Sequence, residues 1–212
     1  MLIDTTLQAH AFEFVRYNRL PETTPEDLAA AVLEWQEGFL AHQDGVVQHA
    51  FLGNLRGEFG DILLMRDSDA LARLEEPYQA SDYSKRILSL IDTNSIRFSF
   101  GAILKDGISA VRDFTCVEFG SFALPADSAA TADTVRAASD RIEATYLAES
   151  ENTREHFTGQ MDDRTYCEIV FGRTLAATRR TCLGYVGNAD CQPLLDLFDP
   201  ETVDLDFWTV LA

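Results

Sequence analysis

Basic residues are scarce in this chain of 212 residues. Lys and Arg together number 17 against 35 Asp and Glu, which gives a formal net charge of −18. A chain of this charge repels a phosphate backbone and offers no cationic patch from which counterions could be released. We therefore expect no nucleic-acid partner. The acidity itself indicates solubility or adaptation to salt, because net charge governs solubility and association rather than fold.

Long apolar runs are also missing. No stretch approaches the roughly 18 apolar residues that a membrane span needs. The opening residues, Met1 to Thr6, have neither the basic segment nor the apolar segment of a secretion signal. We therefore expect no membrane partner and a cytoplasmic location.

Cysteine occurs at only four positions, all in the second half of the chain: Cys116, Cys167, Cys182 and Cys191. None of them forms a CxxC pair, the spacing typical of zinc knuckles and dithiol redox motifs. We expect all four to be reduced, small core residues.

Several catalytic motifs are absent as well. The segment 53–57 has two glycines but lacks the Lys-Ser/Thr ending of a phosphate-binding loop. The sequence contains neither a GxSxG elbow nor an HExxH helix. A nucleotide-dependent or classical hydrolytic enzyme is therefore not expected, and no motif indicates a bound metal or cofactor.

What the sequence does contain is an internal repeat. When the chain is shifted along itself by 107 residues, Thr24 meets Thr131 and His49 meets His156. Substituted pairs keep their character, as where Asp61 meets Glu168. A period this long exceeds the roughly 20–50 residues of a solenoid unit and fits two fused small domains. We place them at residues 1–107 and 108–212.

The first copy predicts the element order β-α-β-β-α-β. Thr24, Pro25 and two acidic residues form a typical helix start, and apolar residues follow at helical spacing up to Phe39. The predicted strands cover residues 12–17, 46–55, 59–66 and 95–104, and the predicted helices cover 24–39, 68–74 and 83–91.

The second copy predicts the same order. Its predicted strands cover residues 114–124, 154–161, 166–173 and 202–211, and its predicted helices cover 131–146, 175–186 and 191–198. This connectivity is the ferredoxin-like arrangement, which belongs to the α+β class. Because some strands are apolar on both sides, the open sheet face needs a cover, and the other copy is the obvious one.

Two ferredoxin-like modules packed sheet to sheet in one chain resemble the dimeric α/β-barrel superfamily, and in particular its antibiotic-biosynthesis monooxygenases. The resemblance rests on element order and duplication over nearly the whole chain. It implies an intrachain barrel and a small-molecule substrate, in a protein that is a monomer or a homodimer. No short motif carries the roles of individual residues over from a member family.

A repeated pair of polar residues is the sharpest candidate site. His49 and Asp61 are separated by twelve residues across a predicted hairpin, and so are His156 and Glu168. Such partners lie on one face of an antiparallel pair, close to directly opposite. A carboxylate beside an imidazole favours its protonation and fixes its tautomer, which prepares a general base.

Three interpretations of these pairs stay open. They could satisfy one another structurally on a half-buried sheet. They could carry acid–base catalysis, or surround a divalent ion if they converge. Near the first helix, Tyr17, Trp35 and Phe39 are candidates for an aromatic wall that holds a substrate, with core packing as the alternative.

We therefore carry two hypotheses for function. In the first, the protein is a small-molecule enzyme similar to the cofactor-independent monooxygenases or isomerases of this superfamily, and His49 takes a proton from a phenol or enol. In the second, the protein is a non-catalytic ligand-binding or scaffold protein of the same fold.

Overall fold

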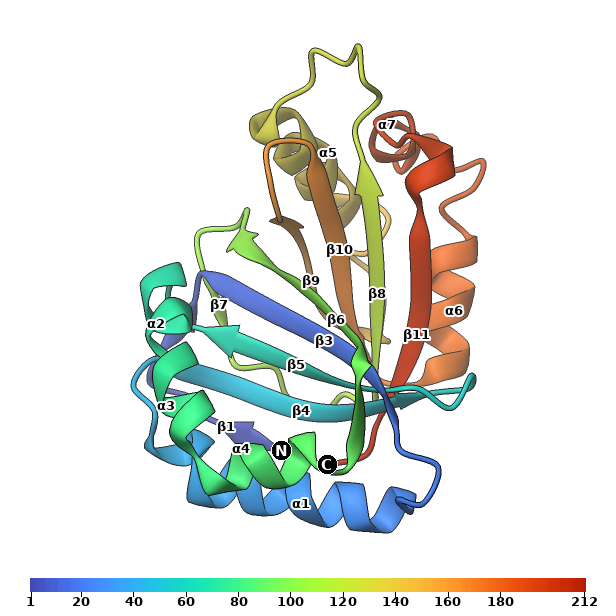
Figure 1. The fold of residues 1–212 in the computed structure, drawn as a ribbon. Helices are drawn as coiled ribbons and strands as arrows, with labels where there is room; N and C mark the ends of the chain where they lie inside the picture. Colours follow the sequence, from blue (N-terminus) through green and yellow to red (C-terminus); the bar gives the residue numbers. More distant parts are fainter. The chain divides into compact units, whose positions relative to one another are not determined.

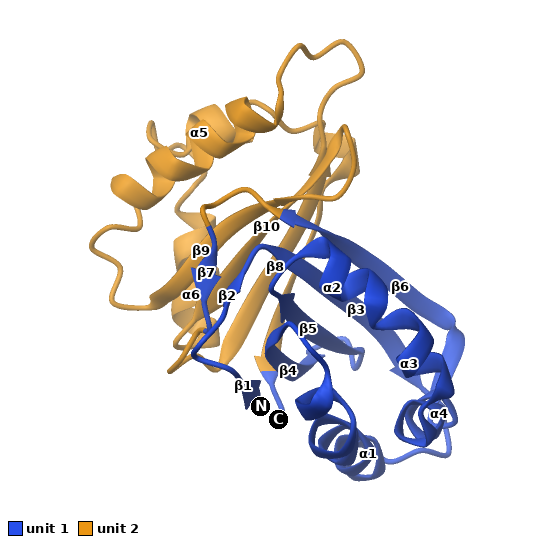
Figure 2. Cartoon of the chain, turned by 90° about the vertical axis from the view of Figure 1, so that its left-hand side faces the viewer, with its two compact units in different colours: residues 1–102, 107–110, 210–212 blue, residues 103–106, 111–209 orange.

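The computed structural model describes residues 1–212, which form two compact units. Unit 1 comprises residues 1–102, 107–110 and 210–212, and unit 2 comprises residues 103–106 and 111–209 (Figure 2). The chain thus passes between the units more than once, and the single boundary at 107/108 stays a prediction.

The main sheet of unit 1 has the strand order β4-β5-β3-β6, with all neighbours antiparallel (Figure 1). Its strands are β3 (Ala11–Arg19), β4 (Val46–Asn54), β5 (Phe59–Met65) and β6 (Ile91–Ile103). The short strand β1 (Leu2–Ile3) adds to this sheet by pairing with β4, while β2 (Gln8–Ala9) and β7 (Ile108–Ser109) form a separate two-stranded sheet. The long crossovers carry the helices of the unit.

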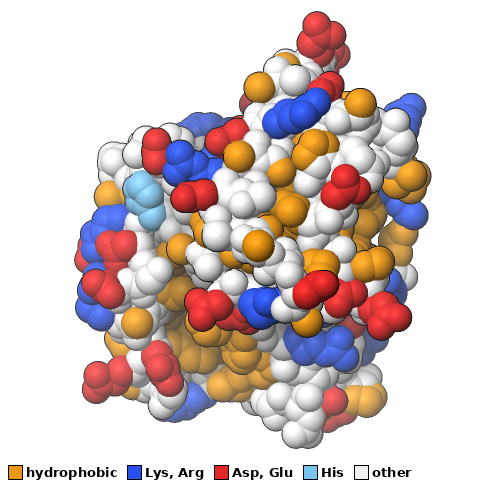
Figure 3. Space-filling model, turned by 90° about the horizontal axis from the view of Figure 1, so that it is seen from above, with side chains coloured by type: hydrophobic (Ala, Val, Ile, Leu, Met, Phe, Trp, Pro, Cys, Tyr) orange, Lys and Arg blue, Asp and Glu red, His pale blue; other side chains and the backbone are white.

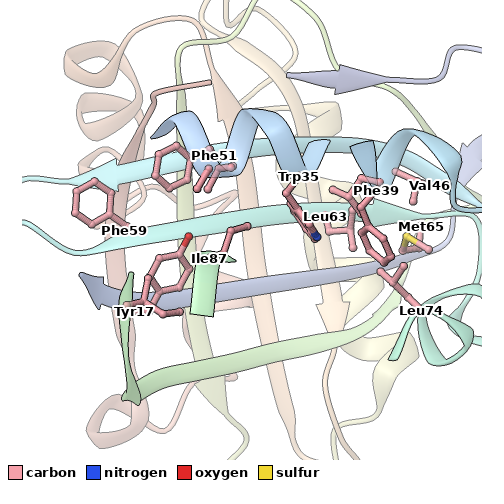
Figure 4. Packing of buried hydrophobic residues seen from close by; sticks show 14 of the residues in the cluster. Tyr17, Trp35, Phe39, Val46, Phe51, Phe59, Leu63, Met65, Leu74 and Ile87 are labelled. Carbon is pink, nitrogen blue, oxygen red and sulfur yellow. The ribbon is translucent and has the colours of Figure 1, made fainter. Parts of the chain in front are cut away.

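Helix α1 (Pro25–Gly38) begins as the sequence predicts. The side chain of Thr24 accepts a hydrogen bond from the backbone N–H of Asp27, and Pro25 occupies the first turn. The apolar stripe of α1 packs with the sheet in a cluster that includes Trp35, Phe51 and Leu63 (Figure 4). The remaining helices are η1 (Leu40–His42), α2 (Ser68–Arg73), α3 (Glu75–Ala80) and α4 (Asp82–Leu88), of which α4 lies against α1.

Unit 2 has the strand order β9-β10-β8-β11, again antiparallel throughout. Its strands are β8 (Cys116–Ala123), β9 (Thr153–Gln160), β10 (Thr165–Gly172) and β11 (Asp204–Val210). Its helices are α5 (Ala132–Ala144), α6 (Leu175–Leu183), α7 (Gln192–Leu195) and η2 (Pro200–Thr202). A second apolar cluster, with Val135 and Ile142 of α5, packs against this sheet.

Antiparallel sheets with separate helices confirm the predicted α+β class. The main differences lie between α2 and β6. The predicted helices at 68–74 and 83–91 leave residues 75–82 unassigned, but α3 forms there with Pro77 in its first turn, where a missing backbone N–H costs no helical hydrogen bond. The expected helix over 83–91 ends at Leu88, and β6 begins at Ile91. No helix is long and apolar enough to cross a membrane.

The gapless 107-residue alignment is wrong for the first strand of each unit. Asp61 pairs with Val15, whereas Glu168 pairs with Gly120. The equivalent positions of β3 and β8 therefore differ by 105 residues, because the loop before α5 is longer than the loop before α1. This shift makes Glu13 the counterpart of Glu118, a match that the gapless alignment hides.

The four cysteines are unpaired, as predicted. Cys116, Cys167 and Cys191 are buried, and Cys182 is half-buried. Burial raises the pKa of all four thiols. This environment fits small core residues and not exposed nucleophiles.

Gly172 marks the closest approach of sheet and helix in unit 2. A Cβ at this position would overlap the hydroxyl of the buried Thr178 in α6 and would lie 3.0 Å from the sulfur of Cys116. We expect Gly172→Ala to lower the free energy of unfolding by about 1–3 kcal/mol, the usual cost of overpacking. Urea denaturation measures this change in the free energy of unfolding. Gly120→Ala is the control, since its nearest neighbour is the flexible end of Leu205 at 3.2 Å, and an equal loss in both variants would contradict the prediction.

Candidate functional site

His49 and Asp61 touch, as the sequence predicts. The Nε2 atom of His49 in β4 lies 2.8 Å from Oδ1 of Asp61 in β5. They are not directly opposite, however: Asp61 pairs with Phe51, and His49 pairs with Leu63. The closing pair of the hairpin sets this register, so the two side chains meet along a diagonal of the same sheet face.

Two further side chains complete the hydrogen bonds of this pair. The amide Nε2 of Gln36 in α1 lies 2.7 Å from Nδ1 of His49, and the hydroxyl of Tyr17 in β3 donates to Oδ2 of Asp61 at 2.7 Å. Because an amide NH₂ only donates, Nδ1 accepts and Nε2 carries the proton that His49 donates to Asp61. We call Gln36, His49, Asp61 and Tyr17 the unit 1 network.

The three predicted wall residues are buried around this network. Trp35 meets the ring of His49 edge to face at 5.1 Å, and its indole N–H donates to Ser84 at 3.1 Å. Phe39 stacks on Trp35 at 6.0 Å. Figure 4 shows Trp35 and Phe39 within the apolar cluster of unit 1, together with Tyr17. They therefore pack as core residues, and their role in binding a substrate stays a prediction.

Glu13 is a carboxylate of unit 1 that the sequence analysis missed. It lies in β3 opposite Leu63 and is half-buried on the sheet face of His49 and Asp61. Burial, together with the charge of Asp61, raises the pKa of Glu13 to about 7. Burial and these two carboxylates also raise the pKa of the nearby Tyr78 to about 12. An acidic residue between two phenylalanines in a strand was the signal available in the sequence.

His156 in unit 2 also meets its predicted partner. Its Nε2 atom lies 2.7 Å from Oε1 of Glu168, and its Nδ1 atom lies 2.9 Å from Oε1 of Glu143 in α5. Burial alone would lower the pKa of His156, but the hydrogen bonds to both carboxylates outweigh it and raise that pKa to about 9. His156 is therefore an imidazolium at neutral pH, held between two acids.

Other charged groups surround this imidazolium. Lys105 bridges Glu143 at 2.9 Å and Glu155 at 2.7 Å, and it donates to the backbone carbonyl of His156. The hydroxyl of Tyr185, in the loop between α6 and α7, donates to Glu168 at 2.9 Å. We call Lys105, Glu143, His156, Glu168 and Tyr185 the unit 2 network.

Glu118 in β8 completes the buried acids of unit 2. Burial and the charge of Glu168 raise its pKa to about 8, while a hydrogen bond with the thiol of Cys182 acts in the opposite direction. The side chain is 4% exposed. Glu118 is therefore a carboxyl that stays mostly protonated at neutral pH, enclosed within its unit.

The two networks differ in one decisive position. Gln36 and Glu143 occur at the same place in α1 and α5, so the imidazole of unit 1 faces a neutral amide where the imidazole of unit 2 faces a second carboxylate. A carboxylate on each side stabilises the charged ring of His156. His49 instead donates to a single carboxylate, that of Asp61, and accepts a hydrogen bond from the amide of Gln36.

Neither imidazole offers a free ring nitrogen to a metal or a haem iron. Both nitrogens of His49 and both nitrogens of His156 are engaged within the protein. A metal-ligating histidine uses one nitrogen for the metal and one for an outer partner. The divalent-ion interpretation therefore does not fit either network as it stands.

Comparison with known proteins adds information on the fold. No protein-family model matches the sequence, and no curated protein matches it. A "putative monooxygenase" from Fusobacterium nucleatum superposes with a TM-score of 0.65 at 10% identity, covering 97% of this chain and 94% of that one. An anthrone oxidase-like protein gives 0.58 at 12% identity, covering 100% and 95%.

A mutant chlorite dismutase from Candidatus Nitrospira defluvii also matches, with a TM-score of 0.62 at 6% identity, covering 98% of this chain and 93% of that one. These solved structures belong to the dimeric α/β-barrel superfamily. The chain is therefore similar in fold to these proteins, while the fused tandem duplication stays a prediction, and identities this low establish fold alone.

Proposed function

We propose that this protein is a small-molecule enzyme that moves a proton at the unit 1 network, in the manner of a cofactor-independent monooxygenase or isomerase. The observation that carries the proposal is the hydrogen-bonded contact of His49 with Asp61 opposite a neutral Gln36. Structures named as monooxygenases and as an anthrone oxidase-like protein share the fold, which supports a small-molecule substrate.

The two members of the pair have different access to a substrate. The side chain of His49 is fully buried, whereas that of Asp61 is 16% exposed. Asp61 is therefore the group that a substrate can reach and the one that accepts its proton, while His49 orients the carboxylate through its Nε2–H. A phenol or enol that loses its proton to this pair becomes an anion, which then reacts with dioxygen or is protonated at another atom.

Unit 2 serves as the scaffold counterpart in this proposal. The charged ring of His156 donates to Glu143 and Glu168 and so lowers the basicity of both carboxylates. We propose that both units are ferredoxin-like modules that arose by tandem duplication, and their shared strand order supports this. Packing of the modules as an intrachain barrel stays a prediction.

The function is tested by turnover of a panel of planar phenols and enolisable aromatic ketones. Oxygen uptake detects oxidation, and incorporation of deuterium from D₂O at the carbon next to the carbonyl detects proton transfer alone. We expect at least one of these activities in the wild-type protein. A wild-type protein that catalyses neither reaction with any member of the panel would contradict the proposal.

Exchanging the residue beside each imidazole tests the assignment to unit 1. We expect Gln36→Glu to lower turnover at neutral pH by about tenfold or more, because a second carboxylate favours the charged ring of His49, and a charged ring lowers the basicity of Asp61. A pH profile of turnover measures this loss, since the activity of the variant should return at higher pH. Glu143→Gln is the matched control and should leave turnover unchanged. Equal losses of turnover in both variants would contradict the assignment of the reaction to unit 1.

A non-catalytic scaffold role is the second candidate, and one observation favours it. Every ring nitrogen of His49 and His156 already has a partner within the protein, as in a purely structural polar network. In that case Gln36→Glu would change stability without any effect on a reaction. The same exchange experiment therefore separates the two candidates.

A further inference from the structure

The acid of each histidine–carboxylate pair accepts a hydrogen bond from a tyrosine, but that tyrosine belongs to a different element in each unit. In unit 1, Tyr17 of β3 donates to Asp61 at 2.7 Å. In unit 2, Tyr185 in the loop between α6 and α7 donates to Glu168 at 2.9 Å. The strand position of Tyr17 is occupied in unit 2 by Phe122, at the offset of 105 residues that relates β3 to β8, and Phe122 has no hydroxyl. A strand residue therefore makes in unit 1 the hydrogen bond that a loop residue makes in unit 2.

This exchange leaves one tyrosine of unit 1 with an unused hydroxyl. Tyr78 of α3 is the counterpart of Tyr185, 107 residues earlier in the chain. Because Tyr17 already donates to Asp61, the side chain of Tyr78 makes ring contacts only, and its hydroxyl has no hydrogen bond within the protein. This hydroxyl is not among the buried side-chain atoms that lack a hydrogen bond. It is therefore open to solvent or to a ligand.

Two aromatic rings fix Tyr78 beside the unit 1 network. Trp35 meets the ring of Tyr78 edge to face at 6.0 Å, and Phe39 meets it at 6.3 Å. Trp35 in turn meets the ring of His49 at 5.1 Å. Burial, followed by the charge of Asp61, raises the pKa of Tyr78 to about 12, so the phenol keeps its proton at neutral pH. Tyr78 is therefore a positioned hydrogen-bond donor close to the catalytic pair.

The unit 1 network contains no cation to stabilise negative charge on a substrate. Lys105 bridges the carboxylates of unit 2, whereas no Lys or Arg contacts a member of the unit 1 network. The surface offers little compensation, because the net charge is −18 and acidic and basic side chains are interspersed on the face that Figure 3 shows. A substrate that gives its proton to Asp61 and becomes an anion therefore needs a neutral donor.

We propose that the hydroxyl of Tyr78 donates a hydrogen bond to the substrate oxygen that becomes negatively charged, which makes Tyr78 a catalytic residue. Tyr17 is then a positioning residue that holds Asp61. The proposal rests on the proposed function and supplies the donor that its proton transfer requires. The O–H or C–H bond of the substrate breaks, its proton passes to Asp61, and its electron pair stays on the substrate as a phenolate or enolate. A donor fixed where charge develops stabilises the transition state more than the bound substrate.

Steady-state kinetics of Tyr78→Phe with the best substrate of the panel tests this role. We expect kcat to fall by about tenfold or more, the result of removing a donor to an oxyanion. KM should stay close to the wild-type value, because the hydrogen bond strengthens only as the charge develops. The melting temperature should be unchanged or slightly raised, since this hydroxyl has no partner in the protein to lose.

Tyr185→Phe is the matched control and should give the opposite result. It removes the counterpart hydroxyl, which donates to Glu168 in the interior of unit 2. We expect a lower melting temperature, because a buried carboxylate loses a hydrogen bond, and an unchanged kcat. The two variants delete the same atom from counterpart residues, so this crossed pattern separates a catalytic hydroxyl from a structural one.

Tyr17→Phe adds a pH profile as a second readout. In this variant Asp61 loses a donor that stabilises its charged form, so the acidic limb of the kcat/KM profile should move to higher pH. The other titratable groups beside Asp61 are His49, Glu13 and Tyr78. In Tyr78→Phe the acidic limb should stay in place while the maximum falls, because Tyr78 makes no hydrogen bond to Asp61.

Two outcomes would overturn the proposal: a kcat of Tyr78→Phe close to that of the wild type, or a loss of melting temperature as large as that of Tyr185→Phe. The first would show that the substrate does not use the hydroxyl, and the second that the hydroxyl is structural. Unchanged kcat in Tyr78→Phe together with a loss in His49→Ala rejects this proposal alone. A loss in Tyr78→Phe with turnover that survives His49→Ala rejects only the role of the histidine–carboxylate pair, whereas a wild type without turnover rejects both.

Discussion

Replacing His49 by alanine is expected to lower kcat by about 10²-fold, the low end of the contribution of a positioned general base, because the Asp61 base loses the donor that orients it. The Nε2 proton of His49 is held by Asp61 at 2.8 Å, and Nδ1 is held by Gln36 at 2.7 Å. Removing the ring leaves the Asp61 carboxylate without the Nε2–H that orients it toward the substrate. Steady-state kinetics with the best substrate of the panel measures the effect.

The matched control is His156→Ala, which removes the equivalent ring from the unit 2 network. It should leave kcat within a few-fold of the wild type at a temperature where the variant is folded. Thermal melting of both variants is needed, because the loss of His49 also leaves Gln36 and Asp61 without their partner, at a cost of about 1–3 kcal/mol. Turnover that survives His49→Ala, with similar destabilisation by both replacements, would establish the scaffold role instead.

His156→Ala is expected to lower the free energy of unfolding by about 3–5 kcal/mol, the cost of removing one partner from a buried ion pair. His156 is 2% exposed and lies between Glu143 and Glu168. Without the imidazolium, these two carboxylates face each other with only Lys105 and Tyr185 to offset their charge. Urea denaturation at neutral pH measures the loss.

The same network predicts how stability depends on pH. The folded pKa of His156 is about 9, above its ordinary value of 6.5. A raised pKa means that the folded protein binds this proton more tightly than the unfolded chain does. The contribution of the imidazolium is therefore complete below pH 6.5 and is lost as the pH rises to about 9, a change of about 3 kcal/mol.

Glu143→Gln provides a second variant in case His156→Ala does not fold. It gives unit 2 the amide that Gln36 supplies in unit 1, so the loss of stability should still begin near pH 6.5 but end at a lower pH and be smaller in total. Denaturation curves from about pH 6 to about pH 9 compare it with the wild type. A wild-type protein whose stability is flat over this range would show that His156 is not held as an imidazolium.

The sequence by itself determined the α+β class, most of the regular elements and the contact within each histidine–carboxylate pair. Thr24 and Pro25 start α1 through short-range capping, and the two pairs lie close together because a hairpin brings nearby residues onto one face. Local interactions of this kind depend on neighbouring residues and so can be read from their order in the chain.

The tertiary structure alone decided which groups partner each imidazole and how deeply each buried acid is enclosed. Gln36 and Glu143 reach His49 and His156 from helices, and nothing in the strand pattern reveals that contact. Glu13 and Phe100 meet only through the pairing of β3 with β6, about 87 residues apart in the chain. Charge state and access depend on what packs around a group in space, because burial and neighbouring charges shift protonation, and sequence distance carries no record of either.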